Sequence, residues 1–398
     1  MCDLRQDFPF FENNPGVVWL DNASNTQMPA RVIDRMTRFL SQENANIGRG
    51  EYPAAIKATL EYEKARETVA RFFGCEAGDV AFTFNATDAL NAAAEIVGGE
   101  VLRDGANVIA SRLEHNSCIL PWMRLAEKGG AEMRFIPMKN GVPDIEKIGD
   151  IVDKNTVAAV ITAGSNVTGW RAPLDFICRT FAERDIPLII DASQAAPHEF
   201  IDASRLAFDY MCLSAHKMYA PTGAGVLIAG KKERRDGIYR VGGGTVAEVN
   251  EKGFTRITGV RGIEAGTPNA AAVIAFAETL NYLSDLGINN AWESERKTAD
   301  IIREELKNTD GINVLCGGEE PLPVVAFETE FLSASDVARL LGAEGIAVRA
   351  GKHCAHIAHK TLGVEATVRV SAGIYNTSDD AYELIEKIRF LRGKYGKR

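Results

Sequence analysis

The feature that most constrains the fold of this sequence is an alternation of short β-rich runs with helical segments, which begins near Asp79. The β-rich runs occupy residues 79–84, 106–111, 131–138, 157–164, 186–193, 210–215 and 223–230. Strands that alternate with helices of ten to fifteen residues predict a largely parallel sheet that is covered on both faces, so we expect an α/β fold with a mostly parallel seven-stranded sheet. In such sheets ligands bind at the carboxyl ends of the strands, which directs attention to the residues just after each run.

A second unit follows this alternation. Helical segments at 270–285 and 291–306 precede short strands at 322–328, 346–351 and 367–373, and a closing helix spans 379–396. A chain of 398 residues is too long for one ordinary core. We therefore predict a large α/β domain over residues 15–265 and a smaller α+β domain over 266–398 that is joined by the N-terminal segment 1–14.

Composition excludes several classes of partner. The chain is 46% hydrophobic and 25% charged, as in a globular protein, and its formal net charge of −9 argues against nucleic acid or an anionic membrane. No run of eighteen apolar residues occurs, and the first residues lack the pattern of a signal peptide, so a cytoplasmic location is expected. The seven cysteines, at positions 2, 75, 118, 178, 212, 316 and 354, form no C-x-x-C pair, which fits reduced thiols.

Polar residues follow several of the predicted strands. Asn85, Ala86 and Thr87 lie between a strand and a helix start, where free backbone N–H groups and a hydroxyl form an anion site suited to a phosphate. A plain N-cap by Thr87 is an equal alternative for this short motif. His115 follows the next strand and Asn166 lies in a later turn, and each has an ordinary alternative as a hydrogen-bonded core, cap or turn residue.

The next two strand ends bring a carboxylate and an amine. Asp191 ends a fully apolar strand and would need a cationic or hydrogen-bonding partner, although a helix N-cap explains it equally well. Ser214, His216 and Lys217 follow the next strand, where a buried ammonium is costly unless it is used. A lysine, an aspartate and a phosphate cradle are what pyridoxal 5'-phosphate (PLP) requires, because the lysine forms a Schiff base and the aspartate keeps the pyridine nitrogen protonated.

The stretch "DASQAAPH…FDYMCLSAHKMYAPTGAGVL" resembles the signature of the class V aminotransferase family of PLP enzymes, which has fold type I. Within that family the chain is most similar to the cysteine desulfurases of the SufS-like group, also called group II. The similarity runs nearly end to end, through "DFPFF…VVWLDNASNTQMPARVID", "GIEAGTPN" and "IAVRAGKHCA…VRVSAGIYNT".

The resemblance implies a role for each matching residue. Lys217 would form the Schiff base, Asp191 would pair with the pyridine nitrogen, and His115 would stack on the ring and help to move protons. The remaining cofactor-binding and substrate-binding residues are then implied as a set. The ring hydroxyl would be contacted by Asn166 and Gln194, and the phosphate by Ala86, Thr87, Ser214 and His216. In a homodimer, Thr267 would contact the phosphate in the other subunit. The substrate carboxylate would be bound by Arg349 and Arg369.

Cys354 distinguishes a desulfurase from a generic aminotransferase. It follows Arg349, Lys352 and His353, and three potential cations so close would lower the pKa of a thiol. The resemblance makes its thiolate the nucleophile that attacks the sulfur of L-cysteine, which leaves an enzyme persulfide and alanine. Two alternatives are an inert buried cysteine and a zinc ligand together with His356 and His359; the spacing fits no common zinc site, so we predict no metal.

The sequence thus predicts a PLP-dependent cysteine desulfurase that supplies sulfur for iron–sulfur clusters or thio-cofactors, with L-cysteine and an unidentified sulfur-acceptor or scaffold protein as partners. A selenocysteine lyase and a class V aminotransferase without desulfurase activity are the rivals within the same fold. A non-catalytic sulfur carrier that has kept the fold belongs to a different class, and the presence of both Lys217 and Asp191 disfavours it.

Overall fold

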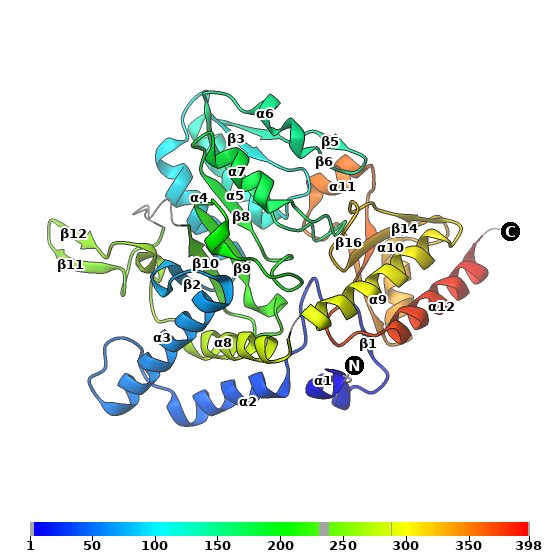
Figure 1. Ribbon diagram of the computed structural model, residues 1–398, viewed down its shortest axis with the longest axis horizontal. Helices are drawn as coiled ribbons and strands as arrows, with labels where there is room; N and C mark the ends of the chain where they lie inside the picture. Colours follow the sequence, from blue (N-terminus) through cyan, green and yellow to red (C-terminus); the bar gives the residue numbers. More distant parts are fainter. Residues whose placement is uncertain (1–3, 231–238, 288, 397–398) are drawn as a thin grey trace.

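The computed structural model describes residues 4–230, 239–287 and 289–396 (Figure 1). Cys2 and the first three residues of the predicted N-terminal segment lie outside these ranges. Within them, no helix is both long enough and apolar enough to cross a membrane.

A seven-stranded sheet forms the centre of the molecule, as the sequence predicts. Its order is β2-β10-β9-β8-β7-β3-β4, and every neighbouring pair is parallel except the two pairs that involve β10. The strands are β2 (Val80–Thr83), β3 (Asn107–Ala110), β4 (Glu132–Phe135), β7 (Thr156–Thr162), β8 (Leu188–Asp191), β9 (Tyr210–Ser214) and β10 (Gly225–Ala229).

Helices cover both faces of this sheet, and they explain why its central strands are almost entirely apolar. On one face, α4 (Ala86–Val101) and α5 (Asn116–Gly129) bury a cluster rich in alanine, with Trp122 at its centre. On the other face pack α3 (Pro53–Phe73), α7 (Leu174–Ala182) and α8 (Ala270–Asp285), and α2 (Ala30–Arg38) lies against α8 (Figure 1). Both faces of the sheet are therefore buried from solvent, and its polar side chains lie mainly at the ends of the strands.

A four-stranded antiparallel sheet, in the order β13-β14-β17-β16, forms a second layer with its own core. Its strands are β13 (Ile312–Val314), β14 (Val324–Thr329), β16 (Arg349–Gly351) and β17 (Thr367–Ser371), and α9 (Asn289–Lys307), α10 (Ala334–Ala343) and α12 (Ser378–Tyr395) pack with them. Near its edge, β1 (Val18–Trp19) pairs in parallel with β15 (Ile346–Ala347), which ties residues just after the predicted segment 1–14 to this unit. The domain boundary at residue 265 stays a prediction.

Several short elements complete the described chain. The hairpin of β11 (Val246–Asn250) and β12 (Gly253–Arg256) extends away from the sheet (Figure 1), and the sequence reading did not predict it. The others are α1 (Pro9–Asn13), β5 (Met138–Lys139), β6 (Val142–Pro143), α6 (Ile148–Ile151) and α11 (His356–Leu362).

Candidate active site

A cavity of about 220 Å³ lies at the carboxyl ends of β8 and β9. Residues that follow strands of the large sheet, residues of the small sheet and the loop after β1 (Ala23 and Ser24) line it together. Eleven of the sequence-predicted site residues are among them: Ala86, Thr87, His115, Asn166, Asp191, Ser214, His216, Lys217, Arg349, Cys354 and Arg369.

The anion site that the sequence predicts after β2 is present as a helix N-terminus. Asn85, not Thr87, is the N-cap of α4, since its side chain accepts the N–H of Asp88 at 2.9 Å. The alternative role of Thr87 as a cap is therefore wrong, and its hydroxyl instead lies 2.7 Å from that of Ser117. The N–H of Ala86 donates to the Ser214 hydroxyl at 2.7 Å, which connects the start of α4 to the end of β9.

Lys217 occupies a single 3₁₀ turn, Ala215–Lys217, that directly follows β9. Burial lowers the pKa of its amine to about 8, Asp191 opposes this shift, and Arg369 and Arg349 add to it. The side chain of Asp191 is held at the end of β8, where its Oδ1 accepts the N–H of Ser193 at 3.0 Å. A carboxylate and an amine thus lie at neighbouring strand ends, as the sequence predicts.

Two histidines of the cavity are neutral. His115 caps α5, and its Nδ1 accepts the N–H of Ser117 at 3.1 Å, so the ring proton resides on Nε2. Burial, reinforced by Lys217, lowers the pKa of His115 to about 4, and the same two causes lower that of His216 to about 4. His115 is therefore both a cap and a cavity residue, which the sequence left as alternatives.

Two arginines of the small sheet lie on one side of the cavity, next to the loop that follows β1. Arg369 on β17 donates from Nη2 to Ser24 Oγ at 2.6 Å and to Asp21 at 3.0 Å, and from Nη1 to the carbonyl of Asn166 at 3.1 Å. Arg349 donates to the same Ser24 hydroxyl at 2.8 Å. The buried Nε of Arg369 has no partner, so this guanidinium retains a free donor.

Cys354 is exposed, and it lies on the turn between β16 and α11. Cys354 and His353 both have left-handed backbone, with φ of 54° and 49°, which is unusual for side chains of this kind. Two hydrogen bonds hold the turn: the N–H of Asn116 donates to the Cys354 carbonyl at 2.6 Å, and Asn166 Nδ2 donates to the His353 carbonyl at 2.7 Å.

One sequence inference about this turn is wrong. His353 is not a cation beside the thiol, because its side chain is buried and burial, followed by Arg369, lowers its pKa to about 2. Sequence spacing alone could not distinguish a buried imidazole from an exposed one.

Two predicted residues lie outside the cavity lining. Gln194 is buried beside it and donates from Nε2 to the carbonyl of Ala23, a lining residue, at 2.8 Å. Thr267 is exposed and lines a separate small cavity with Phe84 and Arg240. The role of Thr267 in the site of another subunit stays a prediction.

Sequence reasoning missed four lining residues, Ala23 and three serines. Ser117 follows the same strand as His115, so the rule that selected His115 could also have found it. Ser24 lies far from the strand ends in sequence, and only tertiary contact shows that it bridges both arginines. Ser193 lies two residues after Asp191, and its buried hydroxyl has no partner.

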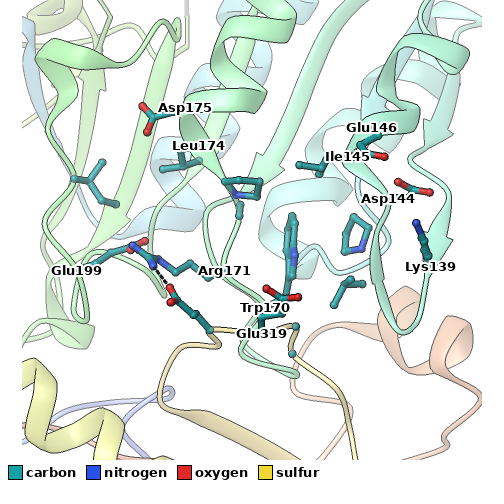
Figure 2. Close-up of a pocket in the computed structure, with 18 of the residues that line it drawn as sticks. Lys139, Asp144, Ile145, Glu146, Trp170, Arg171, Leu174, Asp175, Glu199 and Glu319 are labelled. Atoms are coloured by element: carbon teal, nitrogen blue, oxygen red, sulfur yellow. Dashed lines mark hydrogen bonds and ion pairs between the residues drawn. The ribbon is translucent and has the colours of Figure 1, made fainter.

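A wider cavity of about 1350 Å³ lies elsewhere, between the segment around Asp144 and the loop around Glu319 (Figure 2). Trp170, Arg171 and Glu199 are among its walls, and Arg171 pairs with Glu199 and Glu320. None of the sequence-predicted site residues lines it. The smaller cavity is therefore the candidate active site.

The zinc alternative at Cys354 receives no support from the geometry. His356 Nδ1 lies 3.0 Å from the side-chain amide of Asn116, whereas His359 is buried with its Nδ1 3.0 Å from the Ala355 carbonyl. Among the described residues, no three side chains of the metal-binding types come together.

PLP fits the smaller cavity. The start of α4 with Thr87 offers donors for a phosphate, Asp191 offers a carboxylate for a pyridinium, and Lys217 offers an amine for the aldehyde. Two buried polar atoms of the lining, Asn166 Oδ1 and Ser193 Oγ, have no partner, and polar groups of a bound cofactor would satisfy such atoms.

Known proteins resemble this chain over nearly its full length. The sequence matches the aminotransferase class-V family over residues 18–384. It is 33% identical to a probable cysteine desulfurase of Xylella fastidiosa (strain 9a5c), and the match covers 98% of this chain and 96% of that relative. It is 34% identical to a probable cysteine desulfurase of Vibrio cholerae serotype O1, and that match covers 97% of this chain and 96% of the relative.

Solved structures agree with the sequence relatives. A cysteine desulfurase from Thermococcus onnurineus NA1 in its apo form superposes with a TM-score of 0.93 at 28% identity, and 98% of each chain is covered. The cysteine desulfurase CsdA from Escherichia coli gives 0.91 at 29% identity, again over 98% of each chain. The chain is a member of the class-V aminotransferase family, whose enzymes depend on PLP.

Proposed function

We propose that this protein is a PLP-dependent cysteine desulfurase of the SufS-like group, which converts L-cysteine to L-alanine and retains the sulfur as a persulfide on Cys354. The observation that supports this most is the place of Cys354, which lines the same 220 Å³ cavity as Lys217, Asp191 and the two arginines. A thiol beside an amino-acid site is what a desulfurase needs and an aminotransferase does not.

The arginines would bind the carboxylate of the substrate. Ser24, Asp21 and the Asn166 carbonyl hold the Arg369 guanidinium, so its orientation is fixed before the substrate arrives. Its free Nε donor, together with neighbouring Arg349, suits a carboxylate, which binds guanidinium through paired hydrogen bonds. The α-carbon of the amino acid is thereby directed toward Lys217.

Lys217 would move the proton of the α-carbon at its Nζ atom. Because burial lowers the pKa of this amine to about 8, a useful fraction is neutral near physiological pH and able to accept a proton. When bound, PLP supplies an aldehyde for the amine of the substrate and a ring that withdraws electrons. Asp191, held by the Ser193 N–H, would keep that ring protonated.

Cys354 would then attack the sulfur of the substrate as a thiolate. The bond between the substrate carbon and its sulfur breaks, and a bond between the two sulfurs forms on the enzyme. Arg349 and Arg369, which line the same cavity, favour the negative charge of the attacking sulfur. Lys217, which then holds the proton taken from the α-carbon, would return a proton to the product carbon, and neutral His115 would lie beside this path in the same cavity.

Incubation of the holoenzyme with L-cysteine, with alanine and sulfide measured separately, tests this proposal. We expect wild-type protein with a reductant to release both in equal amounts, and Cys354→Ala to lose at least about 100-fold in rate, because the nucleophile is gone. Cys316→Ala is the matched control, since Cys316 is also exposed but lies outside the cavity. Sulfide release by Cys354→Ala at the wild-type rate would contradict the mechanism.

The same variants distinguish the rival activities. A selenocysteine lyase would release selenide from selenocysteine in wild type and Cys354→Ala alike, while it releases little sulfide from cysteine. An aminotransferase would instead yield a keto acid, and its rate would not depend on Cys354.

We further propose a cytoplasmic homodimer that passes its sulfur to a separate acceptor or scaffold protein. One exposed aromatic side chain supports the dimer, since Phe84 is 48% exposed and lines a small cavity with Thr267, the residue that the resemblance assigns to the partner's phosphate. The described cysteines are free thiols, which fits a reducing compartment.

A further inference from the structure

Tyr219, two residues after Lys217, has an unusual backbone conformation. Its φ is 63°, in the left-handed region that residues with bulky side chains rarely adopt, and its side chain is fully buried. Conformations of this kind cost free energy, so they persist only where the surrounding structure holds them from several sides. Because such residues cluster at active sites, the groups that hold Tyr219 are candidates for a role in the site.

Thr26, in the loop after β1, holds the backbone on both sides of Lys217. Its hydroxyl accepts the N–H of Tyr219 at 2.7 Å and donates to the carbonyl of His216 at 2.9 Å. The partners fix these directions, since a backbone N–H can only donate and a carbonyl can only accept. The N–H of Thr26 also donates to the His216 carbonyl, at 3.1 Å. Thr26 therefore makes three hydrogen bonds to the backbone that flanks the lysine.

The turn that carries Lys217 has little rigidity of its own. It is a single 3₁₀ turn, Ala215–Lys217, which the N–H of Met218 closes by donating to the Ala215 carbonyl at 2.8 Å. A longer helix repeats such bonds at every residue, whereas a single turn does not. The position of the Lys217 backbone therefore depends on contacts from outside the turn, such as those of Thr26.

Thr26 is itself held on both sides, so it is a fixed support. The carbonyl of Asn25 accepts the indole N–H of Trp19 at 3.1 Å, and the N–H of Gln27 donates to the Tyr375 hydroxyl at 3.1 Å. Thr26 is 3% exposed, so solvent does not readily replace the bonds of its hydroxyl.

We propose that Thr26 is a positioning residue that sets where the amine of Lys217 lies relative to the aldehyde of PLP. The lysine side chain is long and flexible, so the place of its amine depends on the backbone from which it starts. A displacement of about 1 Å at a reacting group can lower a rate about 100-fold. Thr26 does not line the cavity, so it acts through the backbone of His216 and Tyr219.

A second threonine provides a contrast on the other side of Tyr219. Thr279 on α8 is buried, and its hydroxyl donates to the carbonyls of Tyr219 and Ala275 at 3.3 and 3.2 Å. The Tyr219 carbonyl leads away from Lys217 along the chain. The Thr279 hydroxyl therefore supports the fold of this region without bracketing the lysine.

The rate at which the apoenzyme attaches PLP to Lys217 tests the positioning role. Apoenzyme is mixed with saturating PLP, portions are quenched with borohydride over time, and the labelled Lys217 peptide is counted by mass spectrometry. In Thr26→Val, which keeps the shape and loses the hydroxyl, we expect this rate to fall about tenfold. Thr26→Ala should show the same loss without the second methyl group of valine, and Thr26→Ser should restore the wild-type rate.

Thr279→Val is the matched control. It also removes a buried hydroxyl next to Tyr219, so we expect a comparable fall in melting temperature but attachment of PLP at the wild-type rate. Attachment at the wild-type rate in Thr26→Val or Thr26→Ala would overturn the positioning role. An equal slowing in Thr279→Val would overturn it as well, and so would a Thr26→Ser variant as slow as Thr26→Val.

Steady-state kinetics of the PLP-loaded enzyme give a second readout. Ser24, and not Thr26, bonds the two arginines that would bind the substrate carboxylate. We therefore expect Thr26→Val to lower kcat for sulfide release about tenfold and to change the KM for L-cysteine less than about twofold. A higher KM with an unchanged kcat would contradict the positioning role.

This inference rests on the proposed role of Lys217, because Thr26 acts through the backbone of that residue. Attachment of PLP needs no L-cysteine, however, so the two proposals can fail separately. If wild type attaches PLP at Lys217 but releases no sulfide from L-cysteine, the desulfurase proposal falls and the attachment rates still decide the role of Thr26. If PLP attaches to a different lysine, both proposals fall.

Discussion

Glu114 illustrates how burial decides the chemistry of a single residue. It directly precedes His115, is 2% exposed, and its Oε1 accepts the hydroxyl of Ser111 at 2.6 Å. Burial raises the pKa of its carboxyl to about 7, although the bond to Ser111 acts in the opposite direction. The carboxyl group of Glu114 is therefore largely protonated, and so uncharged, in mildly acidic solution.

This shift predicts a pH-dependent stability. Because the folded-state pKa of Glu114 is raised from 4.5 to about 7, its contribution is fully present below pH 4.5 and is lost as the pH rises through 7. The loss amounts to about 3 kcal/mol at one pKa unit per 1.36 kcal/mol. We therefore expect the melting temperature of Glu114→Gln, relative to wild type, to be higher at pH 8 than at pH 5 by scanning calorimetry.

Glu365→Gln, at an exposed position, is the control and should show no such change between the two pH values. A constant difference between Glu114→Gln and wild type from pH 5 to pH 8 would show that Glu114 does not titrate in this range.

The sequence was enough to predict which residues come together at the strand ends, but not whether each of them is charged or neutral. Lys217, Asp191 and His115 follow buried strands, and the parallel sheet brings such positions to one edge. The neutral state of His353 depends on burial by residues distant in sequence, which no spacing rule contains.

At the scale of elements, β10 approaches the turn between β2 and α4 more closely than a side chain would allow. A Cβ atom built on Gly225 would lie 2.6 Å from the Cα of Asn85, the residue that caps α4. Backbone atoms cannot yield as a flexible side chain can, so this glycine sets the position of the phosphate cradle.

Gly225→Ala should therefore weaken cofactor binding. We expect the Kd for PLP to rise at least about tenfold, because the start of α4 has to shift away from Ser214, which Ala86 now contacts. Titration of the apoenzyme with PLP, followed by absorbance, measures this. Gly78→Ala, where a Cβ would meet nothing within 4 Å, should leave the Kd unchanged, and an unchanged Kd in Gly225→Ala as well would remove β10 from this role.

Strands and helices with a clear hydrophobic pattern in the sequence were predicted well, whereas elements without such a pattern were not. Six of the seven sheet strands are mainly apolar runs between turn residues, whereas the edge strand β4 (Glu132–Phe135) is partly exposed. The helix predicted at 270–285 matches α8, Ala270–Asp285. The β11–β12 hairpin is largely exposed and has no buried face, so no hydrophobic pattern marks it in the sequence.

At the scale of the whole molecule, Arg369 connects three parts of the chain that are far apart in sequence. It projects from the small sheet and bonds both to Asp21 and Ser24 in the loop after β1 and to Asn166 after β7 of the large sheet. The site is complete only when all three parts are in place, which explains why Ser24, 345 residues from Arg369, escaped prediction.

Arg369→Lys should raise the KM for L-cysteine more than about tenfold and change kcat less, because an ammonium cannot reproduce the paired hydrogen bonds of guanidinium. Steady-state kinetics over a range of L-cysteine concentrations measure both constants. Arg339→Lys, on the exposed side of α10, is the matched control. Equal KM values for wild type and Arg369→Lys would exclude Arg369 from substrate binding.

Two hydrogen bonds fasten the backbone at His353 and Cys354, so a persulfide formed on Cys354, as proposed, would have little reach. Its outer sulfur could move only by rotation about the Cα–Cβ and Cβ–Sγ bonds of that side chain. An acceptor would therefore have to approach the entrance of the cavity and place its nucleophile there.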